Sequence, residues 1–314
     1  MNAIQVQNLH KTYKNGVKAL NGLNLTVKSG EIFSLLGQNG AGKSTLIKIL
    51  TTCLKADSGS MAVCGKNIGT DPGFARSNIA CVSQQISIDS HLSLEENMMF
   101  QSELYKVPRD QAKKRMKALI KKLELESFLK YPLASYSGGI KRRLDIAMNM
   151  VSGPKILFLD EPTVGMDIQS RLAMWNMMKN IQTDFGTTIF LTTHYLEEAD
   201  SLSDTICIMR DGQAAVQGSP FELKGYLRQD SVKAAFYTKD HAKAAKEQLS
   251  NHFDKYKITV QDTVMTVISD DSRHTMQTVM QFLLEQQILF RGIEISQPSL
   301  EDVYIRLTDK ETKE

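Results

Sequence analysis

Residues 37–45 read GQNGAGKST, a glycine-rich run that ends in Lys-Ser-Thr. It follows an apolar run at 31–37, EIFSLLG, and precedes TLIKILTTCL at 45–54, whose apolar residues have helical spacing. A loop of the form G-x-x-x-x-G-K-[ST] between a strand and a helix lets consecutive backbone N–H groups turn inward around a polyphosphate. The sequence therefore predicts a phosphate-binding loop, residues 37–45, at the carboxyl end of a strand.

Two side chains of this phosphate loop have separate expected roles. Lys43 can reach the β- and γ-phosphates, and the Ser44 hydroxyl can bind Mg²⁺. The helix that starts near Lys43 adds the positive end of its dipole. The alternative is a chance match in a glycine-rich turn, which the flanking strand and helix argue against. The candidate phosphate-binding residues are Gly37, Asn39, Gly40, Gly42, Lys43, Ser44 and Thr45.

Two carboxylates end a second apolar run, KILFLD at 155–160. Asp160 and Glu161 come where ligands bind in open parallel sheets, beyond the carboxyl ends of the strands. We expect Asp160 to hold Mg²⁺, directly or through water, and Glu161 to be the general base for an attacking water. Alone, the pattern also fits any strand that ends in a charged turn.

A second phosphate-seeking segment is Tyr136-Ser137-Gly138-Gly139, which opens the helical run IKRRLDIAMNMVSG. Ser137 is a natural N-cap, and the helix N-terminus offers N–H groups to an anion. One chain then has two nucleotide-phosphate sites but only one phosphate loop, so the second site could serve another subunit's nucleotide. The alternative is an ordinary capped helix.

The bulk composition is that of a globular protein of one large or two modest domains. The chain has 314 residues, is 42% hydrophobic, and has a net charge of +3, too small to argue for a nucleic-acid partner. Its four cysteines are expected to be reduced and mostly buried. No apolar run reaches the ~18 residues of a spanning helix, and the amino terminus is too polar for a signal peptide. We expect any membrane role to come through a partner.

The pattern of strands and helices predicts two domains, 1–224 and 225–314. Strands alternate with helices in the first, which implies a mostly parallel sheet covered on both sides. Its helix at 109–123 has an apolar face, and its lysines form a solvated face. In the second domain the order β-α-β-β-α-β predicts a small split βαβ domain, and a final helix at 299–307 carries an apolar stripe.

The phosphate loop, the segment 136–139 and Leu159-Asp160-Glu161-Pro162, in this order, resemble the ATP-binding cassette (ABC) family. The family's usual Leu-Ser-Gly-Gly-Gln is changed here to Tyr136 and Ile140 at its ends, with the Ser-Gly-Gly centre intact. The resemblance implies an α/β P-loop NTPase cassette with a mostly parallel core sheet, an antiparallel N-terminal β subdomain and a helical subdomain. A small α+β C-terminal domain follows it.

The same resemblance implies roles for further residues. Tyr13 matches the aromatic residue that stacks on adenine, and Gln84 matches the glutamine that senses Mg²⁺ and the membrane partner, with Gln85 beside it as an alternative register. Asp167 matches the loop that crosses the dimer interface. His194 matches the switch histidine near the γ-phosphate. The implied ligands are ATP and Mg²⁺.

In such a family the chain would act as a head-to-tail homodimer, or a heterodimer with a related cassette. Each ATP would lie between Lys43 of one copy and Ser137 and Gly139 of the other. The partner would be an integral-membrane permease, which would hold the chain at the cytoplasmic face of the membrane.

Lys141-Arg142-Arg143-Leu144 and the tail PSLEDVY at 298–304 resemble the daunorubicin-resistance type of bacterial exporter ATPase. That resemblance implies export of a drug, antibiotic, peptide or other hydrophobic compound. The competing interpretations are a soluble cassette ATPase acting on nucleic acid or ribosomes, and a non-enzymatic nucleotide sensor.

Overall fold

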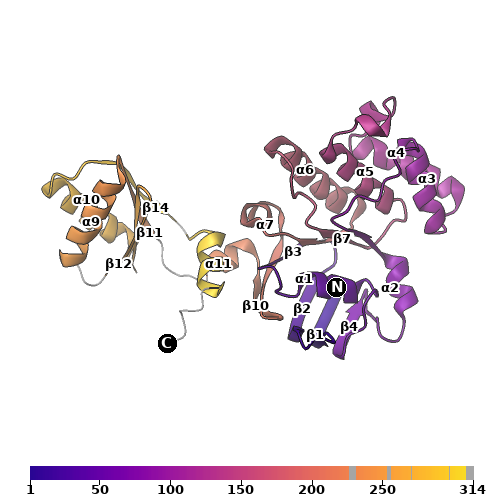
Figure 1. Cartoon of the computed structure of the whole chain (residues 1–314), viewed down its shortest axis with the longest axis horizontal. Coiled ribbons are helices and arrows are strands. Elements are labelled where there is room, and N and C mark those ends of the chain that lie inside the picture. The colour runs from indigo at the N-terminus through magenta and orange to yellow at the C-terminus, as the bar shows by residue number, and fades with distance from the viewer. Residues whose placement is uncertain (226–230, 253–255, 270, 297, 309–314) are drawn as a thin grey trace. The chain divides into compact units, whose positions relative to one another are not determined.

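The computed structural model describes residues 1–225, 231–252, 256–269, 271–296 and 298–308. The chain divides into two compact units, Met1–Pro220 and Phe221–Glu314. We predicted a boundary after residue 224, at the end of helix α8 (Pro220–Gly225), whereas the division falls at the start of that helix. Figure 1 shows the elements of both units.

An antiparallel sheet forms the first layer of the cassette unit, Met1–Pro220. Its strands are, in spatial order, β2 (Lys18–Lys28), β1 (Asn2–Thr12), β4 (Ser58–Val63) and β5 (Lys66–Asn67). The β1–β2 hairpin turns at Asn15-Gly16, where Gly16 has a φ of 83° and Tyr13 N donates to Val17 O. The Asn-Gly pair predicted this turn because it tolerates positive φ.

A six-stranded sheet forms the centre of the cassette unit. Its strands are, in spatial order, β10 (Gln213–Gly218), β9 (Thr205–Arg210), β3 (Ile32–Gly37), β8 (Thr188–Thr192), β7 (Ile156–Asp160) and β6 (Ile79–Val82). All neighbours pair in parallel except β10, which returns antiparallel from β9 through a turn at Asp211-Gly212. The predicted mostly parallel sheet is confirmed.

Alternate residues of the central strands enter two separate cores. Phe33, Phe158 and Phe190 lie on one face, with ring centroids 5.1 and 5.2 Å apart, among residues of β1, β2 and α1. Leu157 and Leu191 lie on the other face, among residues of the long helices. Because successive side chains of a strand point to opposite faces, a sheet covered on both sides needs apolar residues at every position.

Helices cover both faces of this sheet. Figure 1 shows α5 and α6 on one side of β7, and α1 with the antiparallel sheet on the other. The helices of this unit are α1 (Lys43–Leu50), α2 (Pro72–Asn78), α3 (Leu94–Leu104), α4 (Arg109–Lys122), α5 (Gly138–Met150), α6 (Ile168–Phe185) and α7 (Leu196–Leu202), with 3-10 turns at Glu126–Phe128 and Leu133–Ser135.

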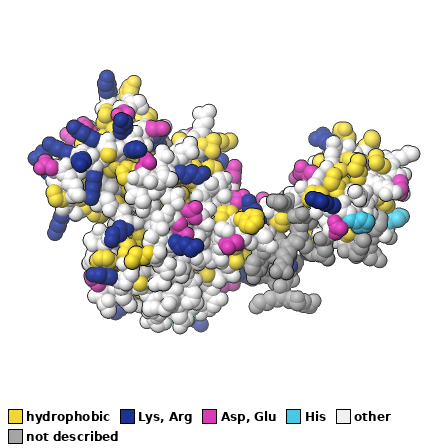
Figure 2. Space-filling model, turned by 180° about the vertical axis from the view of Figure 1, so that it is seen from behind, with side chains coloured by type: hydrophobic (Ala, Val, Ile, Leu, Met, Phe, Trp, Pro, Cys, Tyr) yellow, Lys and Arg dark blue, Asp and Glu magenta, His cyan; other side chains and the backbone are white. Residues whose placement is uncertain are grey.

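Helix α4 contains the basic run of the segment 109–123, and its two faces differ in burial. Met116, Leu119 and Ile120 are buried on one face, while most of its lysines are exposed. Figure 2 shows Lys and Arg side chains projecting over the region of α3 and α4. The predicted solvated basic face is confirmed.

The C-terminal unit contains a four-stranded antiparallel sheet. Its strands are, in spatial order, β12 (Lys257–Gln261), β13 (Val264–Ile268), β11 (Ser231–Phe236) and β14 (Phe290–Ser296). Helices α9 (Lys239–His252) and α10 (Ser272–Glu285) cover its apolar face, so the β-α-β-β-α-β order predicted for this region is present. The final described helix is α11 (Leu300–Thr308), and it is preceded by Ser299, whose hydroxyl accepts a hydrogen bond from Asp302 N at 3.1 Å. Leu300 and Val303 are buried but lie outside the core of this sheet.

The prediction that the cysteines are mostly buried is wrong. All four are free thiols; Cys207 is buried, Cys64 is half-buried, and Cys53 and Cys81 are exposed. Cys81 is the exposed residue of the edge strand β6, whose other residues are buried. Successive side chains of a strand point to opposite faces, so Cys81 points away from the face on which its neighbours Ala80 and Val82 are buried.

Candidate nucleotide site

The carboxyl ends of four parallel strands lie in a row at one edge of the central sheet. In spatial order they are the ends of β3, β8, β7 and β6. The phosphate loop follows β3, His194 follows β8, Asp160 and Glu161 end β7, and Gln84 follows β6. The sheet order therefore gathers residues from distant parts of the chain along one edge.

Glycine is required in the phosphate loop because the backbone turns tightly there. Gly42 has a φ of 105°, and a Cβ at this position would overlap the carbonyl oxygen of Ala19. A Cβ at Gly37 would lie 2.8 Å from Met209 O. Gly40 also has a positive φ, 86°, and Asn39 and Ser44 are exposed at the mouth of the loop.

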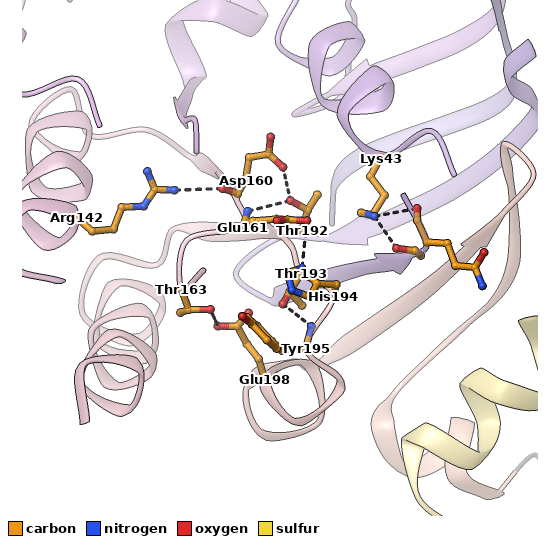
Figure 3. Close-up of polar contacts among 12 residues, drawn as sticks. Lys43, Arg142, Asp160, Glu161, Thr163, Thr192, Thr193, His194, Tyr195 and Glu198 are labelled. Atoms are coloured by element: carbon orange, nitrogen blue, oxygen red, sulfur yellow. Dashed lines mark hydrogen bonds and ion pairs between the residues drawn. The ribbon is translucent and has the colours of Figure 1, made fainter. Parts of the chain in front are cut away.

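Lys43 folds back over the loop that carries it. Its Nζ donates to Gly37 O at 2.6 Å and to Gln38 O at 3.2 Å (Figure 3). Burial lowers the pKa of the Lys43 amine, and the negative charges of Glu161 and Asp160 act in the opposite direction. The lysine therefore lies within the field of both carboxylates.

One threonine contacts both carboxylate residues. The Thr192 hydroxyl donates to Asp160 Oδ1 at 2.5 Å and accepts from Glu161 N at 3.1 Å. Glu161 has a φ of 47°, which is unusual for a residue with a side chain. Backbone conformations of this kind occur at functional sites, where surrounding contacts maintain them.

His194 lies beside the candidate base. Its Nδ1 is 3.4 Å from Glu161 Oε1, and the side chains of His194 and Glu161 are 46% and 20% exposed. The imidazole also packs on Tyr195, with ring centroids 4.3 Å apart. Glu161 and His194 are therefore in contact, and both remain open to a ligand.

A pocket of about 390 Å³ brings together five of the predicted residues. It is lined by Gln84, Ser137, Gly139, Glu161 and Asp167, among others. Its described lining residues do not include those of the phosphate loop, Tyr13 or His194. Of the two candidate glutamines, Gln84 is the one that lines it.

Two capped helices approach each other in this pocket. Ser137 Oγ accepts from Ile140 N at 3.4 Å to cap α5, and Asp167 accepts from Ser170 N at 2.9 Å to cap α6. Hydrogen bonds from Ser170 also lower the pKa of Asp167. A Cβ at Gly139 would lie 3.1 Å from Ser170 Oγ, so the absence of a side chain allows the two helix starts to meet.

Tyr13 contacts the phosphate-loop helix rather than the pocket. Its hydroxyl is 3.1 Å from Thr45 Oγ1, and the residue is 36% exposed. The exposed ring lies where a base could stack on it.

Sequence reasoning missed three buried polar residues of this region: Thr192, Arg142 and Glu198. Arg142 donates to Ser83 O and, at 3.1 Å, to Asp160 O, and it pairs with Asp145 at 3.5 Å. The three-residue spacing of Arg142 and Asp145 on one helix was a usable signal.

Glu198 is fully buried on α7. Its Oε1 accepts from Thr163 Oγ1 at 2.8 Å and from Trp175 Nε1 at 2.9 Å. It therefore ties the segment after Glu161 to α6 and α7, and Figure 3 shows its hydrogen bond with Thr163. Its position on the same helix face as Leu202 could have marked it as buried.

Comparisons with known proteins agree with this arrangement. A family model described as "ABC transporter" matches residues 20–164. A daunorubicin/doxorubicin resistance ATP-binding protein of Streptomyces peucetius is 35% identical over 321 residues, which is 99% of this chain and 96% of the relative. This chain belongs to the ABC transporter family. It is an ATP-binding subunit and an ATPase of that family.

Two further matches support the assignment. Nod factor export ATP-binding protein I of Burkholderia orbicola is 31% identical, covering 99% of this chain and 98% of the relative. The structure of cbiO1 from Clostridium perfringens, part of the ABC transporter complex cbiONQ, is 31% identical with a TM-score of 0.67, covering 72% of this chain and 93% of that one. The predicted family and the daunorubicin-resistance likeness are confirmed, and the nucleic-acid alternative has no support among these relatives.

Proposed function

We propose that this ABC ATPase powers export of a drug, antibiotic, peptide or other hydrophobic compound through a separate membrane permease. The observation that carries the proposal is similarity along the whole chain to one protein named for drug resistance and another named for Nod factor export. Among the described helices, none combines the length and the apolar character that crossing a bilayer requires. The proposed permease would hold the chain at the cytoplasmic face of the membrane.

The residues beside the phosphate loop fit a Mg²⁺ ion bound with ATP. Mg²⁺ prefers oxygen ligands, and Asp160, the Ser44 hydroxyl and the Gln84 amide supply them. Asp160 Oδ1 accepts a hydrogen bond from the Thr192 hydroxyl, and no described residue donates a hydrogen bond to Oδ2. When bound, Mg²⁺ neutralises charge on the β- and γ-phosphates.

Hydrolysis is assigned to the row of strand ends. Lys43 binds the β- and γ-phosphates, and Glu161 accepts a proton from the attacking water. His194, 3.4 Å from Glu161, orients the base and the γ-phosphate. Tyr13 stacks on the adenine, and its contact with Thr45 places the ring beside the helix that binds the phosphates.

A second copy of the chain, or a related cassette, completes each site. Ser137 and Gly139 of one copy contact the γ-phosphate held by Lys43 of the other, and Asp167 lies at the contact between copies. Ser137, Gly139 and Asp167 line one pocket together with Glu161, and phosphate-loop residues are not among its described lining, which leaves room there for a phosphate loop from a second copy.

Transport into inverted membrane vesicles tests the proposal. The chain is co-expressed with a candidate permease, and uptake of fluorescent daunorubicin is measured with ATP and Mg²⁺. We expect ATP-dependent accumulation that Lys43→Ala abolishes. Accumulation only in right-side-out vesicles would mean import. No transport of a panel of hydrophobic antibiotics and peptides, despite permease-stimulated ATPase activity, would contradict the export assignment while leaving the ATPase assignment intact.

A further inference from the structure

Thr192 occupies a central place in the row of strand ends. It is the last residue of β8, which lies between β3 and β7, and it pairs with Leu35 on one neighbour and Asp160 on the other. The residue is 0% exposed. Its side chain is therefore fixed between the strand that leads to the phosphate loop and the strand that ends in the two carboxylates.

The direction of the hydrogen bonds follows from their chemistry. A carboxylate only accepts, so the Thr192 hydroxyl donates its one proton to Asp160 Oδ1, 2.5 Å away. The hydroxyl oxygen of Thr192 also accepts from Glu161 N at 3.1 Å, and the Thr192 carbonyl accepts from that N–H at 3.1 Å as well. One hydroxyl thus contacts both residues that the proposed mechanism needs (Figure 3).

Each contact has a consequence for the site. The hydrogen bond from Thr192 restrains the Asp160 carboxylate through Oδ1 and leaves Oδ2 for a ligand. Two acceptors on Glu161 N support a φ of 47°, and this backbone places the Glu161 carboxylate 3.4 Å from His194. Valine would fill the same volume but could neither donate nor accept.

We propose that Thr192 is a positioning residue, whose hydroxyl orients the metal-binding carboxylate Asp160 and the backbone of the base Glu161. The inference rests on the roles proposed above for Asp160 and Glu161, and it adds a residue to which the comparisons give no role.

A merely structural threonine on the same strand provides a matched control. Thr188 is 2% exposed, and its hydroxyl accepts from Gly30 N at 2.9 Å. It begins β8, whereas Thr192 ends it. Thr188→Val therefore removes a buried hydroxyl from the same strand without touching either carboxylate.

The experiment compares Thr192→Val, Thr192→Ser and Thr188→Val in the full chain. It measures steady-state ATPase activity, Mn²⁺ affinity by electron paramagnetic resonance with a non-hydrolysable ATP analogue, and Tm without ligand. Hydrogen bonds to charged groups are worth about 1.5–3 kcal/mol, so Thr192→Val is expected to lower kcat roughly tenfold or more and to weaken Mn²⁺ binding severalfold. Thr192→Ser keeps the hydroxyl and should stay near wild type, while Thr188→Val should lower Tm alone.

The proposal is overturned if Thr192→Val matches Thr188→Val in kcat and Mn²⁺ affinity, or if Thr192→Ser is as impaired as Thr192→Val. If the valine variant does not fold, Thr192→Cys, with a weak donor, carries the same comparison. Two further variants, Asp160→Asn and Glu161→Gln, distinguish a failure of the proposed role of Thr192 from a failure of the proposed catalytic site. Normal turnover in both would overturn the proposed site as well, whereas lost turnover in both with normal Thr192→Val would overturn only the role of Thr192.

Discussion

The central sheet of the cassette and the sheet of the C-terminal unit organise chemistry differently. The cassette's central strands run parallel except for β10, so their carboxyl ends meet at one edge with Lys43, Asp160, Glu161 and His194. In the C-terminal unit every pair of neighbours is antiparallel, so adjacent strand ends point in opposite directions. Parallel order concentrates polar groups at one edge, and antiparallel order disperses them.

The two sheets also differ in how completely their residues are buried. All six residues of β3 are buried, whereas residues of β11 alternate between buried and half-buried. The cassette sheet is covered on both faces and leaves its strand ends as the place for polar chemistry. The C-terminal sheet has one apolar face, and it carries none of the residues assigned to ATP.

The largest effect on ATP binding is expected at the turn that starts the parallel edge. Gly42→Ala would place a Cβ against the Ala19 carbonyl at a positive φ, which must distort the phosphate loop. Overpacking costs about 3 kcal/mol at the upper end, so ATP affinity should fall roughly a hundredfold. Isothermal titration with an ATP analogue measures it. Gly73→Ala, on the exposed part of α2 with room for a Cβ, is the control and should bind normally; equal affinity in both variants would contradict the tight-turn argument.

The next effect tests whether each ATP site needs residues from two copies of the chain. Lys43→Ala and Ser137→Arg should each be inactive alone. In a mixed dimer both changes fall in one site and leave the other intact, so mixing should restore part of the ATPase activity. Native mass spectrometry verifies that mixed dimers form. Mixed dimers without recovered activity would falsify the head-to-tail arrangement.

Much of this edge could be predicted from sequence, for a physical reason. The phosphate loop and the pair Asp160-Glu161 are consecutive residues, so their neighbours in the chain report their surroundings. Thr192 instead meets Asp160 32 positions away, and Arg142 meets Ser83 59 positions away. These contacts depend on the order of strands in the sheet, which no local pattern specifies.

A smaller effect is expected where the helical region meets the strand ends. Arg142 contacts Ser83, next to Gln84, and the Asp160 carbonyl, while its partner Asp145 accepts from Ser87 at 2.6 Å. Arg142→Met removes these contacts and should therefore loosen the segment 83–87 and lower kcat about tenfold, which corresponds to about 1.4 kcal/mol in the activation free energy. Hydrogen exchange of that segment and steady-state kinetics measure the two effects.

Arg143→Met is the matched control for this change. Arg143 contacts the carbonyls of Leu123 and Glu124 at the end of α4, away from the strand ends. It should lower Tm but leave kcat and exchange at 83–87 unchanged. Similar kinetics in the two variants would show that Arg142 contributes only to stability.

The smallest effect on ATP binding is expected from removing the antiparallel unit. A chain that ends at Gly225 keeps the whole row of strand ends, so its ATP affinity should stay within about twofold of the full chain. We expect altered dimer fraction or altered coupling to the permease, measured by analytical ultracentrifugation and vesicle transport. Lost ATP binding in a folded truncated chain would mean that the domain boundary is wrong. If ATP affinity, dimer fraction and transport are all unchanged, the C-terminal unit has no regulatory role.

The most direct test of the account is single-turnover hydrolysis by Glu161→Gln with ATP and Mg²⁺. Removing a general base lowers the rate by roughly 10²–10⁴-fold, and the amide leaves the hydrogen-bonding shape of the site nearly unchanged. We expect normal ATP affinity, a cleavage rate reduced to that extent, and an ATP-bound dimer on size-exclusion chromatography. Cleavage at the wild-type rate would contradict the assignment of hydrolysis to the ends of the parallel strands.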